Sequence, residues 1–176
     1  VEAQTRKLME VCRMRNTPVM VFVNKLDRPG RDPFDILDEI EEELKIKVRP
    51  LAWPMGSGTE FNGVYNIFEE HLYLFTPDIN DKALLQHIPE NAAETLREEL
   101  ELVQGVYPEF DKEAYLKGEL APVFFGSALN NFGVRELLHA FLKIAPSPRP
   151  SHAETRVVHP GEDKFSGLVF KLHANL

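Results

Sequence analysis

Cysteine is almost missing from this sequence, since Cys12 is the only one among 176 residues. No internal disulfide can form, so we expect a reducing compartment and predict a cytoplasmic location. Long apolar runs are missing as well. The run at 19–23 has the length of a strand and is far shorter than the ~20 residues of a membrane-spanning helix. We therefore expect no membrane partner.

Positive charge is in deficit, because the sequence has 20 Lys and Arg but 28 Asp and Glu, and its formal net charge is −8. This balance argues against a domain that binds nucleic acid through a broad basic face of its own. It leaves open docking on a large ribonucleoprotein through proteins. The histidines are scattered, with no pair four residues apart on a helix, so no metal site is predicted.

The sequence does contain a rhythm of helix, buried strand, polar loop and capped helix. Residues 3–15 have the apolar spacing of an amphipathic helix, and 19–23 is a continuous β-branched run typical of a parallel sheet. Asp32 and Pro33 then open a second helix with a capping carboxylate and a proline at its first position. The same rhythm returns near Pro122. This predicts an α/β fold, a partial doubly wound domain of the P-loop-NTPase type.

Two apolar stripes and two aromatic side chains are predicted to face the core. They are Ile36, Leu37, Ile40 and Leu44 on the second helix, Val134, Leu137, Leu138 and Phe141 on the last helix, and Trp53 and Phe124.

The stretch from Arg28 to Gly126 is far longer than the ~30 residues of a βαβ unit. Its short extended segments and turns predict an inserted α+β subdomain. The predicted organisation is a partial α/β domain at 1–46 and 119–145, the insertion at 47–118, a proline-rich linker at 146–160 and the first strand of a β-barrel domain at 161–176. Because the chain starts within a helical pattern and stops in a strand-like run, we expect it to be a fragment of a longer protein.

The loop after the first buried strand reads Asn24, Lys25, Leu26, Asp27 and matches the guanine-specificity motif of GTP-binding proteins. Guanine presents two adjacent donors, N1–H and N2–H, and the carboxylate of Asp27 can accept both. Adenine lacks this pair and would leave the carboxylate unsatisfied. Asn24 can reach guanine acceptors or tie neighbouring loops together, and Lys25 can lie along the face of the base.

A second polar loop, Gly126, Ser127, Ala128 and Leu129, follows the other buried strand. A backbone N–H in a loop of small residues can approach the guanine O6, and Ala128 is the predicted donor. Ser127 can brace the loop by a hydrogen bond to the neighbouring motif. Together, the two loops predict binding of the guanine part of GTP or GDP by Asn24, Lys25, Asp27, Ser127, Ala128 and Leu129.

The sequence contains no phosphate-binding Gly-x-x-x-x-Gly-Lys-Ser/Thr motif and no upstream Asp-x-x-Gly on the magnesium side. We therefore place no catalytic residue and no Mg²⁺ ligand in this chain. The isolated chain is predicted to be inactive as a GTP hydrolase, although its parent is predicted to be one.

Across essentially its whole length the sequence resembles translational GTPases of the bacterial ribosome, and among them peptide chain release factor three. The general matches are the two loops, the long insertion and a β domain after a proline-rich linker. The more specific matches are at 5–11, 24–28, 31–33, 53–54, 100–103, 121–134 and 162–167, whereas 76–87 departs from the resemblance.

The resemblance implies a ribosome-dependent GTPase that acts in translation termination and promotes the release and recycling of codon-reading release factors. Its implied partners are the bacterial ribosome, including the stalk proteins of the large subunit that the insertion faces in related factors, and the codon-reading release factors. Mg²⁺ belongs to the implied parent.

Two alternatives stay open. One is an elongation factor G-like or ribosome-protection GTPase, which the number of downstream domains would separate. The other is a non-catalytic interaction module in which the two loops are relics.

Overall fold

The computed structural model describes residues 1–74, 90–167 and 169, and the chain forms two compact units, Val1–Ala145 and Pro146–Leu176. The first unit contains α1 (Ala3–Met14), β1 (Val21–Val23), α2 (Pro33–Leu44), β2 (Lys47–Pro50), β3 (Ala52–Met55), a 3₁₀ turn η1 (Gly58–Glu60), β4 (Gly63–Asn66), β5 (His71–Leu74), α3 (Glu90–Val106), α4 (Lys112–Lys117), β6 (Leu120–Phe125) and α5 (Val134–Ile144).

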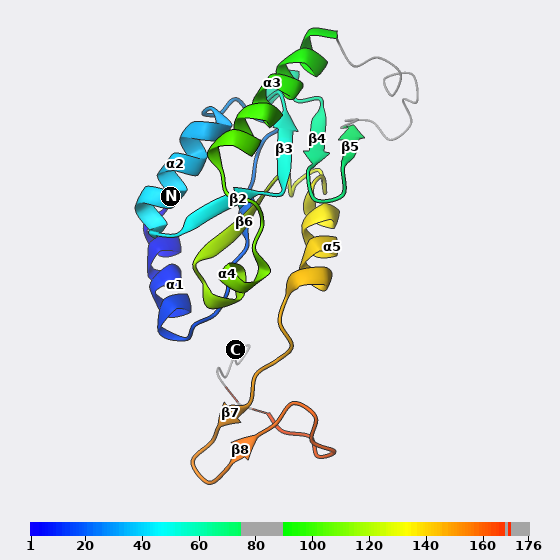
Figure 1. The fold of residues 1–176 in the computed structure, drawn as a ribbon. Helices are drawn as coiled ribbons and strands as arrows, with labels where there is room; N and C mark the ends of the chain where they lie inside the picture. The colour runs from blue at the N-terminus through cyan, green and yellow to red at the C-terminus, as the bar shows by residue number, and fades with distance from the viewer. Residues whose placement is uncertain (75–89, 168, 170–176) are drawn as a thin grey trace, which may run out of the picture. The chain divides into compact units, whose positions relative to one another are not determined.

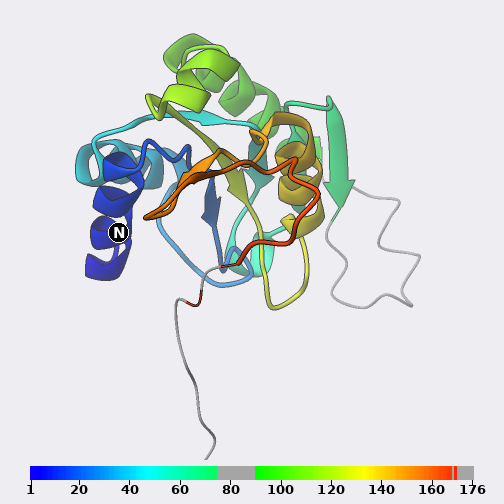
Figure 2. The same ribbon diagram turned by 90° about the horizontal axis from the view of Figure 1, so that it is seen from below.

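The centre of the first unit is a three-stranded sheet in the order β1-β6-β2, in which both pairings are parallel. Every residue of β6 is buried, which explains its unbroken apolar sequence. Helices α1 and α2 lie together beside this sheet, and α5 lies on the opposite side of it in both views (Figures 1 and 2). The parallel sheet and its helices agree with the predicted α/β class.

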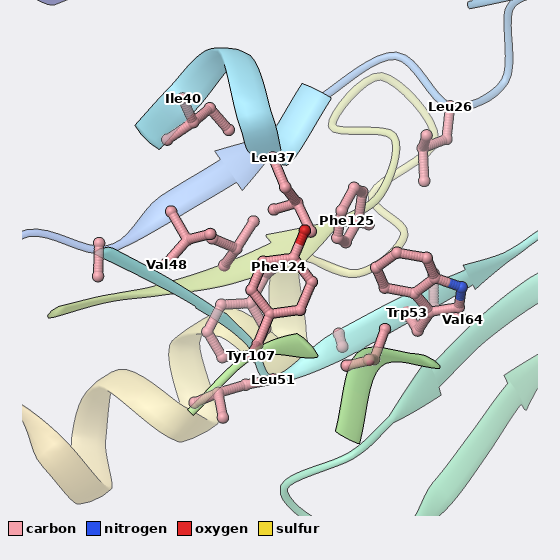
Figure 3. Close-up of a cluster of buried hydrophobic side chains, with 14 of the residues drawn as sticks. Leu26, Leu37, Ile40, Val48, Leu51, Trp53, Val64, Tyr107, Phe124 and Phe125 are labelled. Carbon is pink, nitrogen blue, oxygen red and sulfur yellow. The ribbon is translucent and has the colours of Figure 1, made fainter. Parts of the chain in front are cut away.

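Helix α2 begins as predicted, because the Asp32 side chain accepts a hydrogen bond from the Phe34 N–H at 2.8 Å. Its residues Leu37, Ile40 and Leu44 are buried. Figure 3 shows buried side chains of α2 and of the β2–β3 segment converging on Phe124 and Phe125 of β6. Three of the four predicted stripe residues of α2 are thus confirmed as buried, the fourth, Ile36, is partly buried, and the predicted core positions of Trp53 and Phe124 are confirmed.

A second sheet, in the order β3-β4-β5, is antiparallel, and α3 packs on its strand β3. The indole N–H of Trp53 in β3 donates to Glu99 Oε2 of α3 at 2.8 Å. Burial raises the pKa of Glu99, and this hydrogen bond opposes the shift. The expected boundary at residue 47 needs correction, because β2 pairs with β6 and so belongs to the parallel sheet.

Helix α5 turns only part of its predicted apolar face inward, because Leu137 packs against the core while other members of that face are exposed. Its buried residues are Glu136, Ala140 and Ile144, whereas Leu138 and Phe141 are about half exposed, at 53% and 50%. The spacing of apolar residues locates a helix but does not fix which element covers each face.

The second unit contains a short hairpin of β7 (Ser151–His152) and β8 (Val157–Val158). The segment at 146–160, expected to be a linker, therefore contains paired strands. The predicted barrel strand falls largely on residues 168 and 170–176, outside the described residues, as does the divergent segment 76–87. In the described part of the chain, no helix is both long and apolar enough to cross a membrane.

Candidate functional site

The two predicted loops meet because their strands are parallel neighbours in register. Val23 of β1 lies beside Phe125 of β6, so Asn24 and Gly126 leave the sheet together at its carboxyl edge. The backbone ties them twice, from Gly126 N–H to Val23 O at 3.0 Å and from Leu26 N–H to Gly126 O at 3.2 Å. This is the edge at which α/β sheets bind ligands.

Asn24 connects the two loops through its side chain. Its Oδ1 accepts from the backbone N–H of Lys25 at 2.8 Å and from that of Ala128, also at 2.8 Å. Of the two roles considered for Asn24, the structure thus shows the tie between loops. In the described residues its Nδ2 makes no hydrogen bond, so this donor is available to a ligand.

The backbone around Lys25 has an unusual shape. Lys25 has a φ of 71°, in the left-handed region that few non-glycine residues adopt. The Asn24 bond to its N–H and a turn bond from Arg28 N–H to Lys25 O at 3.1 Å hold this conformation. Lys25 is exposed, whereas Leu26 is 6% exposed and anchors the loop in the core.

Asp27 lies on the same loop with its side chain 16% exposed. Its only ion pair in the described residues is a long one, 3.9 Å from Oδ2 to Nε of Arg28. The carboxylate therefore keeps acceptor capacity for a ligand that presents two adjacent donors. These features fit a guanine edge.

The second loop is shaped by its backbone. A Cβ on Gly126 would lie 2.2 Å from Phe132 O, and a Cβ on Gly133, whose φ is 77°, would lie 2.4 Å from Phe125 O. Ser127 and Phe132 exchange backbone hydrogen bonds at 3.0 and 2.9 Å, which closes the loop. Only glycine fits at both ends of this turn.

Two expected roles in the second loop differ from the observed contacts. The Ala128 N–H, expected to meet guanine O6, donates to Asn24, and buried Ser127 accepts from Nδ2 of Asn130 at 2.9 Å rather than bracing the other loop. Leu129 is 81% exposed at the tip. Its N–H has no hydrogen bond to any described residue, so it is a second backbone donor at this edge.

Sequence reasoning missed one contributor to the site. The N–H of Gly58, from the turn between β3 and β4, donates to Leu26 O at 2.9 Å. The sequence identifies the glycines at 56 and 58 only as a turn, and a turn pattern carries no information about its distant partner.

The arrangement can bind a flat polar ring edge. It combines a carboxylate, an amide donor, backbone N–H groups and the stem of an exposed lysine. Over residues 1–74, 90–167 and 169, no group of three or more His, Cys, Asp or Glu side chains is placed to hold a metal ion.

Two comparisons with known proteins bear on the family and the fold of this chain. Residues 1–147 match the family described as the elongation factor Tu GTP binding domain. The fold is similar to a crystal structure of a protein from Thermus thermophilus, with a TM-score of 0.54 and 24% identity. That similarity covers 84% of this chain and 25% of the other, so this chain spans about a quarter of that protein's length.

Proposed function

Since the chain belongs to the elongation factor Tu GTP-binding domain family, which is a family of translational GTPases, we propose that its part in the protein is to recognise guanine. Asp27 accepts the two donors of the guanine edge, Asn24 donates to a ring acceptor through Nδ2, and Lys25 lies along the base. The backbone N–H of Leu129 meets O6, while Ala128 N–H stays bonded to Asn24 and buried Ser127 keeps this loop in shape.

The observation that carries the proposal is the Asn24 side chain, which joins the loops of β1 and β6 at 2.8 Å. A base held by one loop alone would not need the two loops in a fixed relation. With the tie in place, acceptor and donors face one ligand without further ordering, which lowers the entropic cost of binding.

The parent protein is proposed to be a ribosome-dependent GTPase of the release factor three kind, which acts in translation termination to release codon-reading release factors. The resemblance of 24–28, 53–54 and 121–134 supports this finer assignment. A phosphate-binding loop and the Mg²⁺ ligands are then supplied by parts of the parent outside this sequence. When bound, GTP supplies the phosphoryl group whose transfer those parts promote. The acidic chain suits contacts with ribosomal proteins, the stalk proteins included, better than contacts with RNA.

The test is Asp27→Asn in the full-length parent. Losing two charge-assisted hydrogen bonds should weaken GDP binding by about 100-fold or more. Binding of xanthosine diphosphate should improve, because asparagine offers a donor to the xanthine carbonyl. Isothermal titration with both nucleotides measures the change in preference.

The matched control is Asp38→Asn, which makes the same chemical change on the exposed side of α2. It should bind both nucleotides as the wild type does. Unchanged GDP affinity in Asp27→Asn would contradict the proposal. GTP turnover by the isolated 176-residue chain would contradict its dependence on phosphate-binding parts elsewhere.

A further inference from the structure

The turn between β3 and β4, residues 56–62, touches the first guanine loop. Besides the bond from Gly58 N–H to Leu26 O, the backbone of Gly58 lies against Pro29. A Cβ on Gly58 would sit 3.0 Å from Pro29 N and 3.2 Å from Pro29 Cα, and the φ of Gly58 is 62°. The left-handed backbone conformation favours glycine, and the tight space admits a Cβ only if Pro29 moves by a few tenths of an ångström.

The same turn touches the second guanine loop through an aromatic contact. Phe61 is 6% exposed, and its ring meets that of Phe132 edge to face, with centroids 5.6 Å apart. Phe132 is the residue that closes the second loop through its two backbone bonds to Ser127. A displacement of Phe61 would thus reach the loop that carries Ala128.

The turn is stiff within itself. Gly56, with a φ of 77°, is so close to Glu60 O that a Cβ would lie 2.1 Å away. Asn62 N–H donates to Met55 O at 2.8 Å, and Glu60 N–H donates to Ser57 O at 3.1 Å. Strands β3 and β4 pair directly at its base, from Met55 to Gly63. A shift of the antiparallel sheet is therefore passed on to Gly58 and Phe61 rather than absorbed.

We infer that Gly58 and Phe61 are positioning residues for guanine recognition, and that through them the antiparallel sheet sets how well the two loops fit the base. This inference rests on the proposed function. Neither residue belongs to the predicted site. Gly58 sets the position of the Leu26–Pro29 backbone, which contains Asp27. Phe61 sets the position of the turn at Phe132.

The test is Gly58→Ala in the full-length parent, with GDP and inosine diphosphate as probes. Inosine diphosphate lacks the exocyclic amine and makes only one of the two bonds to Asp27. An alanine at this position would have to adopt the left-handed backbone conformation, and its Cβ would press on Pro29. This should shift the loop and weaken GDP binding by about tenfold. The ratio of GDP to inosine diphosphate affinity should fall, because the second bond to the carboxylate is lost first. A variant that only lowers stability weakens both nucleotides equally.

Gly105→Ala is the matched control, because a Cβ there meets nothing within 4 Å; it should leave both affinities and their ratio unchanged. If Gly58→Ala fails to fold by circular dichroism, Phe61→Leu carries the test, with a smaller fall of the same ratio. An unchanged ratio in a folded variant overturns the inference, provided that Asp27→Asn alters the preference between GDP and xanthosine diphosphate. If Asp27→Asn leaves that preference intact, the proposed function itself falls and this inference falls with it.

Discussion

The loops after β1 and β6 leave the same sheet edge side by side, yet they are built differently. The first, around Asn24, is held by a side chain that accepts hydrogen bonds from two backbone N–H groups. One of these bonds supports the left-handed backbone conformation of Lys25. The second, from Gly126 to Gly133, is held by backbone bonds across the turn and by two positions with no room for a Cβ. Side-chain chemistry shapes one loop, and the absence of side chains shapes the other.

This difference separates the loop that contacts the base through side chains from the loop whose shape depends on its backbone. A loop shaped by polar side chains can present those side chains to a ligand, and a loop shaped by glycines brings backbone N–H groups close to it. Substitutions in the two loops should therefore have different effects on stability and on nucleotide binding. In the glycine loop the change mainly affects stability, whereas in the Asn24 loop it affects binding as well.

The largest effect is expected from Gly126→Ala. The new methyl would meet Phe132 O at 2.2 Å and Phe22 Cζ at 2.8 Å, and both residues are partly buried against the core. Relief requires movement of the backbone, so the free energy of unfolding should fall by about 3 kcal/mol. Urea unfolding of the chain measures this loss. Gly105→Ala, in open space at the C-terminal end of α3, should raise stability slightly, and equal behaviour of the two variants would refute the steric account.

A smaller loss is expected from Asn24→Ala, which removes the tie between the loops. The Lys25 and Ala128 N–H groups lose their acceptor, and we expect about 1–2 kcal/mol by urea unfolding, because both groups are exposed to water. Asn24→Asp keeps an acceptor at the same atom and should retain most of this stability. If both variants unfold alike, the oxygen of Asn24 does not hold the loops.

Ser127→Ala should give the smallest measurable effect, about 1 kcal/mol. The hydroxyl is fully buried and accepts from Asn130, so Nδ2 of Asn130 must find water instead. Thermal unfolding is the measurement. Leu129→Ala, at the exposed tip of the same loop, is the control and should leave the midpoint unchanged. A larger shift for Leu129→Ala than for Ser127→Ala would reverse the roles described here.

Local signals made much of the fold predictable. Asp32 and Pro33 identify the start of α2, and the unbroken apolar run of β6 identifies a strand buried on both faces. The meeting of Asn24 with the second loop also follows from sequence, because parallel neighbours end at one edge. In each case the deciding interaction lies within a few residues or follows from sheet geometry.

Contacts between distant segments that do not follow from neighbouring parallel strands of the predicted sheet were not predictable. Strand β2 joins the parallel sheet, and its Arg49 donates to Tyr107 O just past α3 at 3.2 Å. Burial lowers the pKa of Arg49, and the nearby Glu109 opposes this shift. An arginine in a short strand gives no sign of a partner beyond residue 100. The same reason explains why Ala128 N–H is bonded to Asn24, since two acceptors competing for one donor, here guanine O6 and Asn24 Oδ1, cannot be ranked without coordinates.

The single tryptophan, Trp53, packs against Phe34 of α2 and Phe125 of β6 and donates to Glu99 of α3. It also lies on β3, only a few residues before the turn that supports the guanine loops. The chain thus carries its own fluorophore where the parallel sheet meets the antiparallel sheet of β3, β4 and β5. Its emission can follow a movement of the antiparallel sheet without any attached dye.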